Sequence, residues 1–308
     1  MRRMLFTKKT AEQKRADLRV ALNQDRPLLF PGAHAPIAGM ALERHGFDGL
    51  YISGAAFSAW LGLPDIGLTT LSEVAEHSHR VDRVVDIPTI VDADTGFGEP
   101  MSAARTVRML EEHGVAGCHI EDQVNPKRCG HLDGKEVVPR DQAARRIKAA
   151  AGAKRDANFL LIARTDAAAI EGIDSAIDRA KAYVDAGAEM IFAEAMRDLA
   201  DFETFCTAVA PIPVLANMTE FGKSELFSVD QLHNAGVKLI IYPVTSLRLM
   251  MRAVEDGFSE IKAEGRQTEA VTGRMQTRKE LYDLIRYEDY NNFDTGLFNF
   301  TVTDKGTG

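Results

Sequence analysis

The stretch from Thr89 to Glu121, TIVDADTGFGEPMSAARTVRMLEEHGVAGCHIE, decides the fold of this chain. It opens with a short apolar run that ends at Asp94, and after a glycine-rich turn a helical stretch follows from Pro100 to His113. Gly114 comes next, where a left-handed residue ends a helix at little cost. A second apolar run then leads to Glu121. Runs that are apolar on both faces and alternate with helices indicate parallel strands that are covered on both sides.

The same unit recurs along the chain, so that apolar runs alternate with helical stretches. The eight predicted strands are Leu28 to Gly32, Gly49 to Ser53, Thr89 to Asp94, Gly117 to Glu121, Phe159 to Arg164, Met190 to Glu194, Val214 to Asn217 and Leu239 to Tyr242. Helical stretches between them include Pro100 to His113, Asp141 to Ala151, Ile173 to Ala186 and Val229 to Ala235. Eight such units within roughly 220 residues favour a closed (β/α)8 TIM-type barrel over an open doubly wound sheet. No linker interrupts the pattern, so we predict a single domain over residues 1–308.

Helical segments flank the predicted barrel at both ends. Residues 10 to 24 carry apolar side chains at helical spacing among charges, which is typical of a lid or cap helix. Beyond the eighth strand we predict a C-terminal helical extension of about residues 245–290, with helices from Leu247 to Glu264 and from Arg274 to Tyr290. A barrel does not need the second of these helices, and its apolar side chains require a partner. Another subunit of the same protein would supply one.

The composition argues against several classes of partner. The chain has 308 residues, is 45% hydrophobic and 27% charged, and carries a formal net charge of −8. Nucleic acid and anionic membrane surfaces select for clustered positive charge, so neither is expected as a partner. The three cysteines form neither a disulfide framework nor a C-x-x-C pair, and no stretch is apolar for long enough to span a bilayer. With no signal-peptide pattern at the N-terminus, we expect a soluble protein of the reducing cytoplasm.

The end of the predicted third strand carries two carboxylates. Asp92 and Asp94 have period-two spacing, so both side chains point to the same side of the strand. Adjacent carboxylates repel one another unless a cation lies between them, and one or two carboxylates commonly hold Mg²⁺ with water and substrate. Capping of the next helix is the alternative for either aspartate alone. Glu121 of the fourth strand is a further candidate on the metal side, through water, while His119 beside it is equally a buried structural histidine or a participant.

The loop Lys127-Arg128-Cys129-Gly130-His131 crowds a thiol among two cations and an imidazole. Positive charge favours the thiolate and glycine lets the backbone fold tightly, so Cys129 is a candidate proton donor or nucleophile. Gly130 and Gly134 also suit a loop that acts as a gate over the site. The alternative is an exposed thiol in a solvated surface loop.

Polar side chains also end the later predicted strands. They are Arg164 and Asp166 at strand five, Glu194 at strand six, Asn217 and Thr219 at strand seven, and Arg248 after strand eight. Any one of them alone marks the exit of a strand into solvent, but barrel enzymes build their active sites at this end, which favours a shared site. A pocket with Mg²⁺ and Arg128, Arg164 and Arg248 would suit a small di- or tricarboxylate, because guanidinium groups bind carboxylates bidentately.

Taken together, the motifs of the chain resemble the isocitrate lyase and phosphoenolpyruvate mutase superfamily. They are the Lys-Arg-Cys-Gly-His loop after a strand ending His-Ile-Glu-Asp, Val-Asp-Ala-Asp upstream, Tyr51-Ile52-Ser53-Gly54, Leu61-Gly62-Leu63-Pro64-Asp65, Ala163-Arg164-Thr165-Asp166, Asn217-Met218-Thr219-Glu220-Phe221-Gly222 and Met275-Gln276-Thr277-Arg278. The resemblance runs from about Ala21 to Tyr290. Within the superfamily the chain is most similar to the bacterial 2-methylisocitrate lyases, because isocitrate lyases proper are longer and usually carry Lys-Lys-Cys-Gly-His.

This resemblance implies a Mg²⁺-dependent reaction, with Mn²⁺ as a substitute, that cleaves (2S,3R)-2-methylisocitrate into pyruvate and succinate in propionate breakdown by the methylcitrate cycle. It implies that Asp92 and Asp94 hold the metal, with Glu121 nearby. The implied substrate-binding residues are Ser53, Gly54 and Ala55 at the oxo-acid part and Cys129, Gly130, Arg164, Glu194, Asn217, Thr219, Arg248 and Arg278 elsewhere. It also implies a helix swapped between barrels and a homotetramer, which would explain the surplus C-terminal helices.

In the implied reaction Cys129 protonates the succinate carbanion that leaves when the C2–C3 bond breaks. Lys127, Arg128 and His131 would offset the charge around the thiolate and the intermediate. Tyr51 is one candidate for the base that takes the hydroxyl proton. One departure is Ala55, which stands where some relatives have a third glycine, although the backbone N–H at that position remains.

The resemblance leaves other functions open. Isocitrate and 2,3-dimethylmalate are alternative substrates, although Phe192 and Ile241 would provide apolar surface for the extra methyl group of methylisocitrate. Relatives that decarboxylate oxaloacetate or act on a carbon–phosphorus bond generally lack the cysteine loop, so Cys129 disfavours both activities. A non-catalytic binding protein would have lost a charged residue at a strand end, and none is missing.

Overall fold

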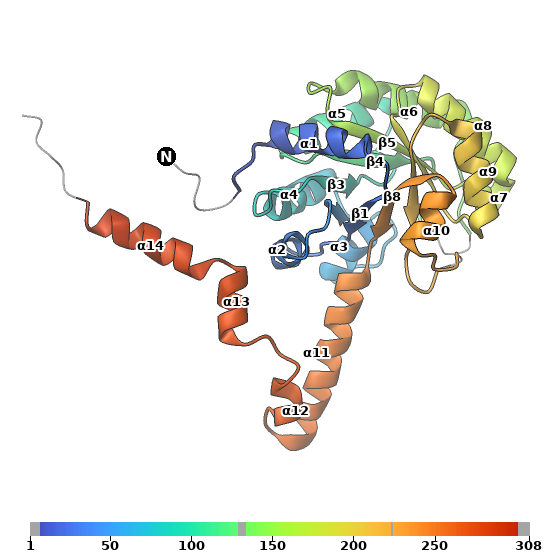
Figure 1. Ribbon diagram of the computed structural model, residues 1–308. Coiled ribbons are helices and arrows are strands. Elements are labelled where there is room, and N and C mark those ends of the chain that lie inside the picture. The colour runs from blue at the N-terminus through green and yellow to red at the C-terminus, as the bar shows by residue number, and fades with distance from the viewer. Residues whose placement is uncertain (1–6, 129–133, 223, 301–308) are drawn as a thin grey trace, which may run out of the picture.

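A computed structural model describes residues 7–128, 134–222 and 224–300 of the chain, and it contains all of the predicted strands (Figure 1). They are β1 (Leu28–Pro31), β2 (Leu50–Ile52), β3 (Thr89–Asp92), β4 (Gly117–Glu121), β5 (Leu160–Thr165), β6 (Met190–Ala193), β7 (Val214–Asn217) and β8 (Val237–Tyr242). Each strand pairs in parallel with its neighbours in the order β1-β8-β7-β6-β5-β4-β3-β2. A parallel bridge between Gly32 and Tyr51 brings β1 beside β2 and completes the ring. The predicted (β/α)8 barrel is therefore confirmed.

Helices surround the barrel on its outer side (Figure 1). They are α2 (Pro36–Arg44), α3 (Gly54–Trp60), α4 (Leu71–Asp82), α5 (Pro100–Glu112), α6 (Arg140–Ala153), α7 (Ala168–Glu171), α8 (Ile173–Asp185), α9 (Leu199–Val209) and α10 (Val229–Asn234). Local chemistry sets several of their starts. Thr70 and Glu73 form a reciprocal capping box at α4, and Pro100 occupies the first turn of α5, where its missing N–H costs nothing.

The two-residue period of each strand separates an apolar lower barrel from a polar upper rim. Inward-facing side chains such as Phe30, Ile90, Ile162 and Leu215 form one fully buried cluster in the barrel interior. Two residues further along, the same faces carry polar side chains, so Ile90 is followed by Asp92 and Ile162 by Arg164. The parallel register then places these polar residues side by side at the C-terminal end of the barrel.

Helix α1 (Ala11–Leu22) closes the opposite end of the barrel, as a cap rather than as a lid over the polar rim (Figure 1). Its Leu18 is fully buried within the interior cluster. Arg15 Nε donates to the carbonyl of Val115 at 3.0 Å, and Arg19 Nη2 donates to the carbonyl of Phe159 at 3.0 Å. Both carbonyls lie just before strands, at their N-terminal ends. The amphipathic pattern of residues 10 to 24 is therefore explained by packing of α1 against the N-terminal end of the barrel.

The C-terminal extension forms an arm that leaves the barrel (Figure 1). It consists of α11 (Thr245–Glu264), α12 (Glu269–Thr272), α13 (Arg278–Leu284) and α14 (Tyr287–Phe298). The prediction of one continuous helix from Arg274 to Tyr290 is wrong, because Arg286 adopts a left-handed conformation with φ 59° and separates α13 from α14. Within the described ranges, no helix is both long and apolar enough to cross a membrane.

Candidate active site

A cavity of about 430 Å³ opens at the C-terminal end of the barrel. Nine of the residues that the sequence predicted for the site line it: Tyr51, Ser53, Ala55, Asp92, Lys127, Arg164, Asn217, Thr219 and Arg248. They come from strands or strand ends that are far apart in the sequence. The parallel barrel brings them together because every strand ends at the same rim.

Asp92 at the end of β3 lines this cavity, Asp94 lies in the turn that follows the strand, and both are buried. Asp92 Oδ2 accepts a hydrogen bond from the backbone N–H of Gly54 at 3.1 Å, and Asp92 Oδ1 accepts one from the N–H of Asp94 at 3.0 Å. Asp94 itself is left-handed, with φ 46°, and its carbonyl accepts from the N–H of Glu121 at 2.9 Å. The turn after β3 is thus fixed by contacts to both neighbouring segments.

Lys127 is the counter-charge of this carboxylate group. Its ammonium lies 2.7 Å from Asp94 Oδ1 and 2.5 Å from Asp65 Oδ1, and the residue is only 3% exposed. Burial alone would lower the pKa of Lys127, but the carboxylates of Asp94 and its neighbours raise it well above its ordinary value. Burial and the nearby charge of Asp92 raise the pKa of Asp94 to about 6 even though Lys127 opposes that change. Asp65 is a member of this charge group that sequence reasoning did not single out.

The oxygen atoms of this group suit a hard divalent cation. Glu121 Oε1 is buried and has no hydrogen-bond partner among the residues with defined positions. Burial raises the pKa of Glu121 well above its ordinary value. No group of three or more His, Cys, Asp or Glu side chains in the described parts of the chain is arranged to ligate one ion directly. Mg²⁺ needs no such group, because it is usually held by one or two carboxylates and keeps several waters, so Asp92 and Asp94 with Glu121 nearby fit it.

Arg164 is the centre of a second buried charge cluster. Its Nε and Nη2 donate to the two carboxylate oxygens of Asp166 at 2.9 and 3.0 Å. Its Nε also lies 3.3 Å from Glu121 Oε2, and its Nη1 lies 3.5 Å from Glu194 Oε2. Burial would lower the pKa of Arg164, but these carboxylates raise it well above its ordinary value. Asp166 therefore anchors the guanidinium, and Glu121 links the Arg164 cluster to the metal side.

Tyr51 and His119 form a hydrogen-bonded pair beside Asp92. Tyr51 Oη lies 2.7 Å from His119 Nε2, and that nitrogen lies 3.6 Å from Asp92 Oδ1. Burial lowers the pKa of His119 to about 4, and burial together with the charge of Asp92 raises the pKa of Tyr51 well above its ordinary value. Both side chains are therefore neutral near pH 7. His119, whose role the sequence left open, is in contact with two predicted site residues.

Some predicted residues lie elsewhere. Arg128 is exposed and does not line the cavity, and the buried side chain of Gln123 holds its backbone through two hydrogen bonds of 2.9 Å. Arg278 begins α13, an exposed position on the arm. Cys129, Gly130 and His131 lie outside the described residues.

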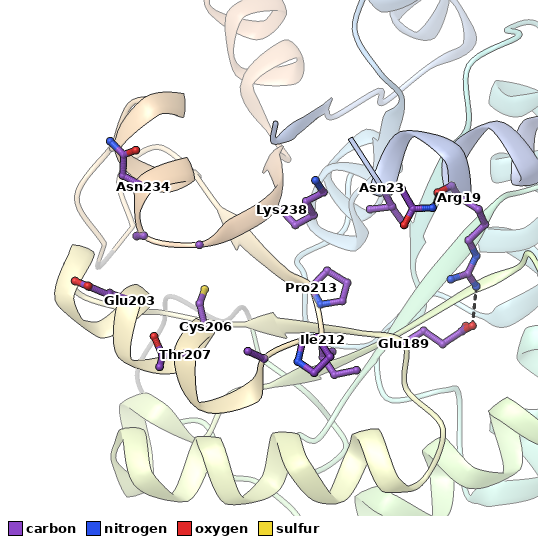
Figure 2. A pocket seen from close by; sticks show the side chains of 15 residues that line it. Arg19, Asn23, Glu189, Glu203, Cys206, Thr207, Ile212, Pro213, Asn234 and Lys238 are labelled. Atoms are coloured by element: carbon purple, nitrogen blue, oxygen red, sulfur yellow. Dashed lines mark hydrogen bonds and ion pairs between the residues drawn. The ribbon is translucent and has the colours of Figure 1, made fainter. Parts of the chain in front are cut away.

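A larger hollow of about 800 Å³ lies at the other end of the barrel, beside α1 (Figure 2). Of its charged lining residues, Arg19, Glu189 and Lys238 are already engaged with other side chains or with the backbone. Arg19 Nη2 pairs with Glu189 Oε1 at 2.8 Å, and Lys238 Nζ donates to the carbonyl of Gln24. Cys206 in its wall has a pKa raised to about 12 by burial, so the thiol is inert there. None of the residues predicted for the site lines this hollow.

Comparisons with known proteins agree with this arrangement. The family described as phosphoenolpyruvate phosphomutase matches residues 18–262. A protein of Corynebacterium glutamicum named probable 2-methylisocitrate lyase 2 is 58% identical over 94% of this chain and 94% of its own length. The 2-methylisocitrate lyase of Aeropyrum pernix is 47% identical over 90% of this chain and 89% of its own.

Solved structures match over almost the whole chain as well. Oxaloacetate acetylhydrolase with 3,3-difluorooxalacetate superposes with a TM-score of 0.88 at 32% identity, covering 96% of this chain and 100% of its own. A 2,3-dimethylmalate lyase gives a TM-score of 0.87 at 31% identity, covering 97% and 99%. Phosphonopyruvate hydrolase with oxalate and Mg²⁺ gives 0.83 at 26% identity, covering 94% and 100%. The chain therefore belongs to the phosphoenolpyruvate mutase and isocitrate lyase family, in the group of lyases that includes the 2-methylisocitrate lyases.

Proposed function

We propose that this lyase cleaves (2S,3R)-2-methylisocitrate into pyruvate and succinate, in the cytoplasm, as a step of propionate breakdown by the methylcitrate cycle. The observation that carries the proposal is the cavity lined by Asp92, Lys127 and Arg164, where Lys127 pairs with Asp94 and Arg164 pairs with Glu121. The names of the relatives at 58% and 47% identity support this substrate. Cationic side chains and a hard metal ion together can neutralise and bind the three carboxylates of such a substrate.

Asp92 and Asp94 would hold Mg²⁺, or Mn²⁺ as a substitute, with Glu121 nearby through water. When bound, the ion polarises the hydroxyl and carboxylate oxygens of the substrate and offsets negative charge as the bond breaks. The phosphonopyruvate hydrolase structure, which contains oxalate and Mg²⁺, supports this assignment. Oε1 of Glu121, which is buried and has no hydrogen-bond partner in the described part of the chain, supports it independently.

The cavity wall divides between polar and apolar contacts to the substrate. We assign the oxo-acid end to Ser53, Gly54 and Ala55, at the start of α3, where Ala55 contributes a backbone N–H. The rest of the substrate would be bound by residues at the ends of the later strands, namely Arg164, Glu194, Asn217, Thr219 and Arg248, with the two arginines meeting its carboxylates. Ile241 lines the cavity and Phe192 lies under the Arg164 guanidinium, 4.9 Å from the ring centroid. Their apolar surface would favour the extra methyl group by about 1 to 3 kcal/mol.

Two proton transfers complete the reaction. Tyr51 would take the proton of the C2 hydroxyl while passing its own phenolic proton to Nε2 of the neutral His119, 2.7 Å away, which would let the C2–C3 bond break. Cys129 would donate a proton to the succinate carbanion, and Gly130 would let its loop approach the substrate. Lys127, Arg128 and His131 would offset the negative charge in that half of the site.

Metal removal tests this chemistry. After treatment with EDTA, the rate of pyruvate release from 2-methylisocitrate is expected to fall below about one per cent of its starting value, because the carboxylates alone cannot offset the charge that develops. Added Mg²⁺ should restore the rate and Mn²⁺ should restore part of it, as a lactate dehydrogenase assay would show. A rate unchanged by EDTA would contradict the metal assignment.

Gly54 offers a second test, since its backbone touches the metal side of the site. A Cβ at this position would lie 3.0 Å from Asp92 Oδ2 and 3.3 Å from Asp94 Oδ1, and neither carboxylate can move without breaking its buried contacts. Gly54→Ala is expected to lower kcat/KM between about ten- and a hundredfold and to raise the Mg²⁺ concentration needed for half-activity. Gly152→Ala, on an exposed face of α6 with open space around it, is the matched control and should retain wild-type values. Full activity of Gly54→Ala would show that the carboxylates of Asp92 and Asp94 can move without loss of function, which would contradict this part of the site.

We further propose a homotetramer in which the arm of one subunit packs on another barrel. The large apolar side chains of the arm support this, since Phe258 is 67% exposed and Phe298 is 89% exposed in the single chain. The same arrangement would carry Arg278 to a neighbouring subunit's site. Sedimentation equilibrium of the full chain is expected to give the mass of four 33.8-kDa chains, about 135 kDa. A mass of one chain at micromolar concentration would contradict the assembly.

A further inference from the structure

Glu220 joins two parts of the molecule beside the cavity. It follows Thr219, which lines the cavity, in the segment after β7. Its Oε2 lies 2.9 Å from Arg248 Nη1, and its backbone carbonyl accepts from the same nitrogen at 2.7 Å. Its Oε1 accepts a hydrogen bond from Thr245 Oγ1. Thr245 and Arg248 both belong to the first turn of α11, so one carboxylate fastens the root of the arm to the β7 segment.

Arg248 is held on a second side by Phe221. The guanidinium carbon lies 5.4 Å from the centroid of the Phe221 ring. Phe221 is 94% exposed and left-handed, with φ 59°. For a bulky residue this conformation is strained, and such strain is concentrated at functional sites. The strained turn presents the ring to the guanidinium in place of burying it.

The pattern of contacts leaves part of the guanidinium for a ligand. All side-chain hydrogen bonds and ion pairs found for Arg248 within the described ranges use Nη1. The side chain is 41% exposed and lines the cavity. A free arginine at such a position would lose much of its rotamer freedom on binding a carboxylate. An arginine that is already held at one nitrogen loses less, and its remaining N–H groups keep a fixed direction.

We propose that Glu220 is a positioning residue that orients Arg248 for a carboxylate of the substrate. This inference rests on the proposed function, because it concerns how that substrate is bound. Glu220 does not touch the substrate in this account, and it acts through Arg248 alone. Its link to Thr245 also sets where α11 begins, but the effect on affinity comes from the guanidinium.

A double-mutant cycle tests the proposal. Glu220→Ala is expected to raise the KM for 2-methylisocitrate about tenfold with kcat changed less than about twofold. In an Arg248→Ala background, Glu220→Ala should produce no further rise in KM. Glu220→Gln, which keeps an acceptor for Nη1, should recover part of the affinity. Glu225→Ala, an exposed residue of the same segment, should behave as wild type.

Thr245→Val separates positioning from the attachment of the arm. It removes the hydrogen bond to Glu220 Oε1 and leaves the Arg248 contacts, so the KM should stay within about twofold of wild type. An equal rise in KM in both Arg248 backgrounds, or the full effect from Thr245→Val, would overturn the proposal and leave the proposed function standing. A fall in KM for Glu220→Ala would overturn it too, because the carboxylate would then compete with the substrate.

The affinity for succinate provides a readout that does not need turnover. The wild type, Glu220→Ala, Arg248→Ala and the double variant are titrated with succinate by calorimetry. Glu220→Ala should weaken succinate binding only when Arg248 is present. If the wild type fails to cleave 2-methylisocitrate, the proposed function falls, and the succinate affinities decide the positioning role alone. If Glu220→Ala weakened succinate binding by the same factor with and without Arg248, the positioning role would be overturned.

Discussion

Lys127→Met is expected to lower kcat by at least about a thousandfold and to reduce the free energy of unfolding by about 3 to 5 kcal/mol. The ammonium lies within 2.7 Å of two carboxylates and is 3% exposed, so its removal leaves buried negative charge without a partner. Methionine has a similar length and fills the space, which separates loss of charge from loss of packing. Initial rates and urea unfolding measure the two effects.

The pH dependence of this loss follows from Asp94. Its pKa is raised to about 6 by burial with Lys127 present, and removal of Lys127 raises it further. A carboxyl with a raised pKa in the folded state takes up a proton that the unfolded chain does not hold, so stability falls as pH rises above the unfolded value of about 3.9. The stability defect of Lys127→Met should therefore be smaller at pH 5 than at pH 8. An equal defect at both values would contradict the charge argument.

Lys154→Met is the matched control for this variant. Lys154 Nζ pairs with Glu189 Oε2 at 2.6 Å and its side chain is 13% exposed, but it lies away from the cavity. Its replacement should lower stability without lowering kcat. A comparable loss of kcat in Lys154→Met would show that the fall in Lys127→Met reports general destabilisation.

Cys129→Ser is expected to lower kcat by about a thousandfold or more while the KM changes little. General acid catalysis contributes roughly 10² to 10⁴ in rate, and a serine hydroxyl is a much weaker acid than a thiol. The substitution removes one proton donor and conserves shape, so substrate binding should survive. Rates of pyruvate release and the affinity for succinate measure the two quantities separately.

The other cysteines of the chain supply controls for that variant. Cys118 and Cys206 are both buried free thiols, and burial raises the pKa of each to about 12. Thiols of this kind are inert. Cys206→Ser should keep wild-type activity, whereas an undiminished kcat in Cys129→Ser would remove that residue from its proposed role.

The sequence was sufficient to predict the barrel because its strands are short, buried on both faces and separated by amphipathic helices. Gly117 to Glu121 and Val214 to Asn217 were predicted to the residue, and other strands differ by one or two residues at their ends. The period-two faces also predicted which polar side chains meet at the rim, as Asp92 and Arg164 illustrate. Both signals are local, so one chain is enough to read them.

Contacts that depend on loops could not be predicted in this way. Asp65 reaches Lys127 from the segment after α3, and Gln123 holds the backbone of Arg128 through its side chain. Glu220, after β7, pairs with Arg248 in the first turn of α11, which follows the neighbouring strand β8. No sequence periodicity predicts such pairs, because the path of a loop depends on the strands and helices that it connects. Likewise, the left-handed conformation of Arg286 separates α13 from α14, where the apolar spacing predicted one continuous helix.

The most direct test of the account is to identify the products that the purified, Mg²⁺-loaded protein releases from 2-methylisocitrate and from isocitrate, each offered separately at equal concentration. We predict pyruvate and succinate from 2-methylisocitrate, with a kcat/KM well above that for isocitrate. Predominant release of glyoxylate from isocitrate would reassign the substrate within the same family. Cleavage of neither compound would contradict the proposed function.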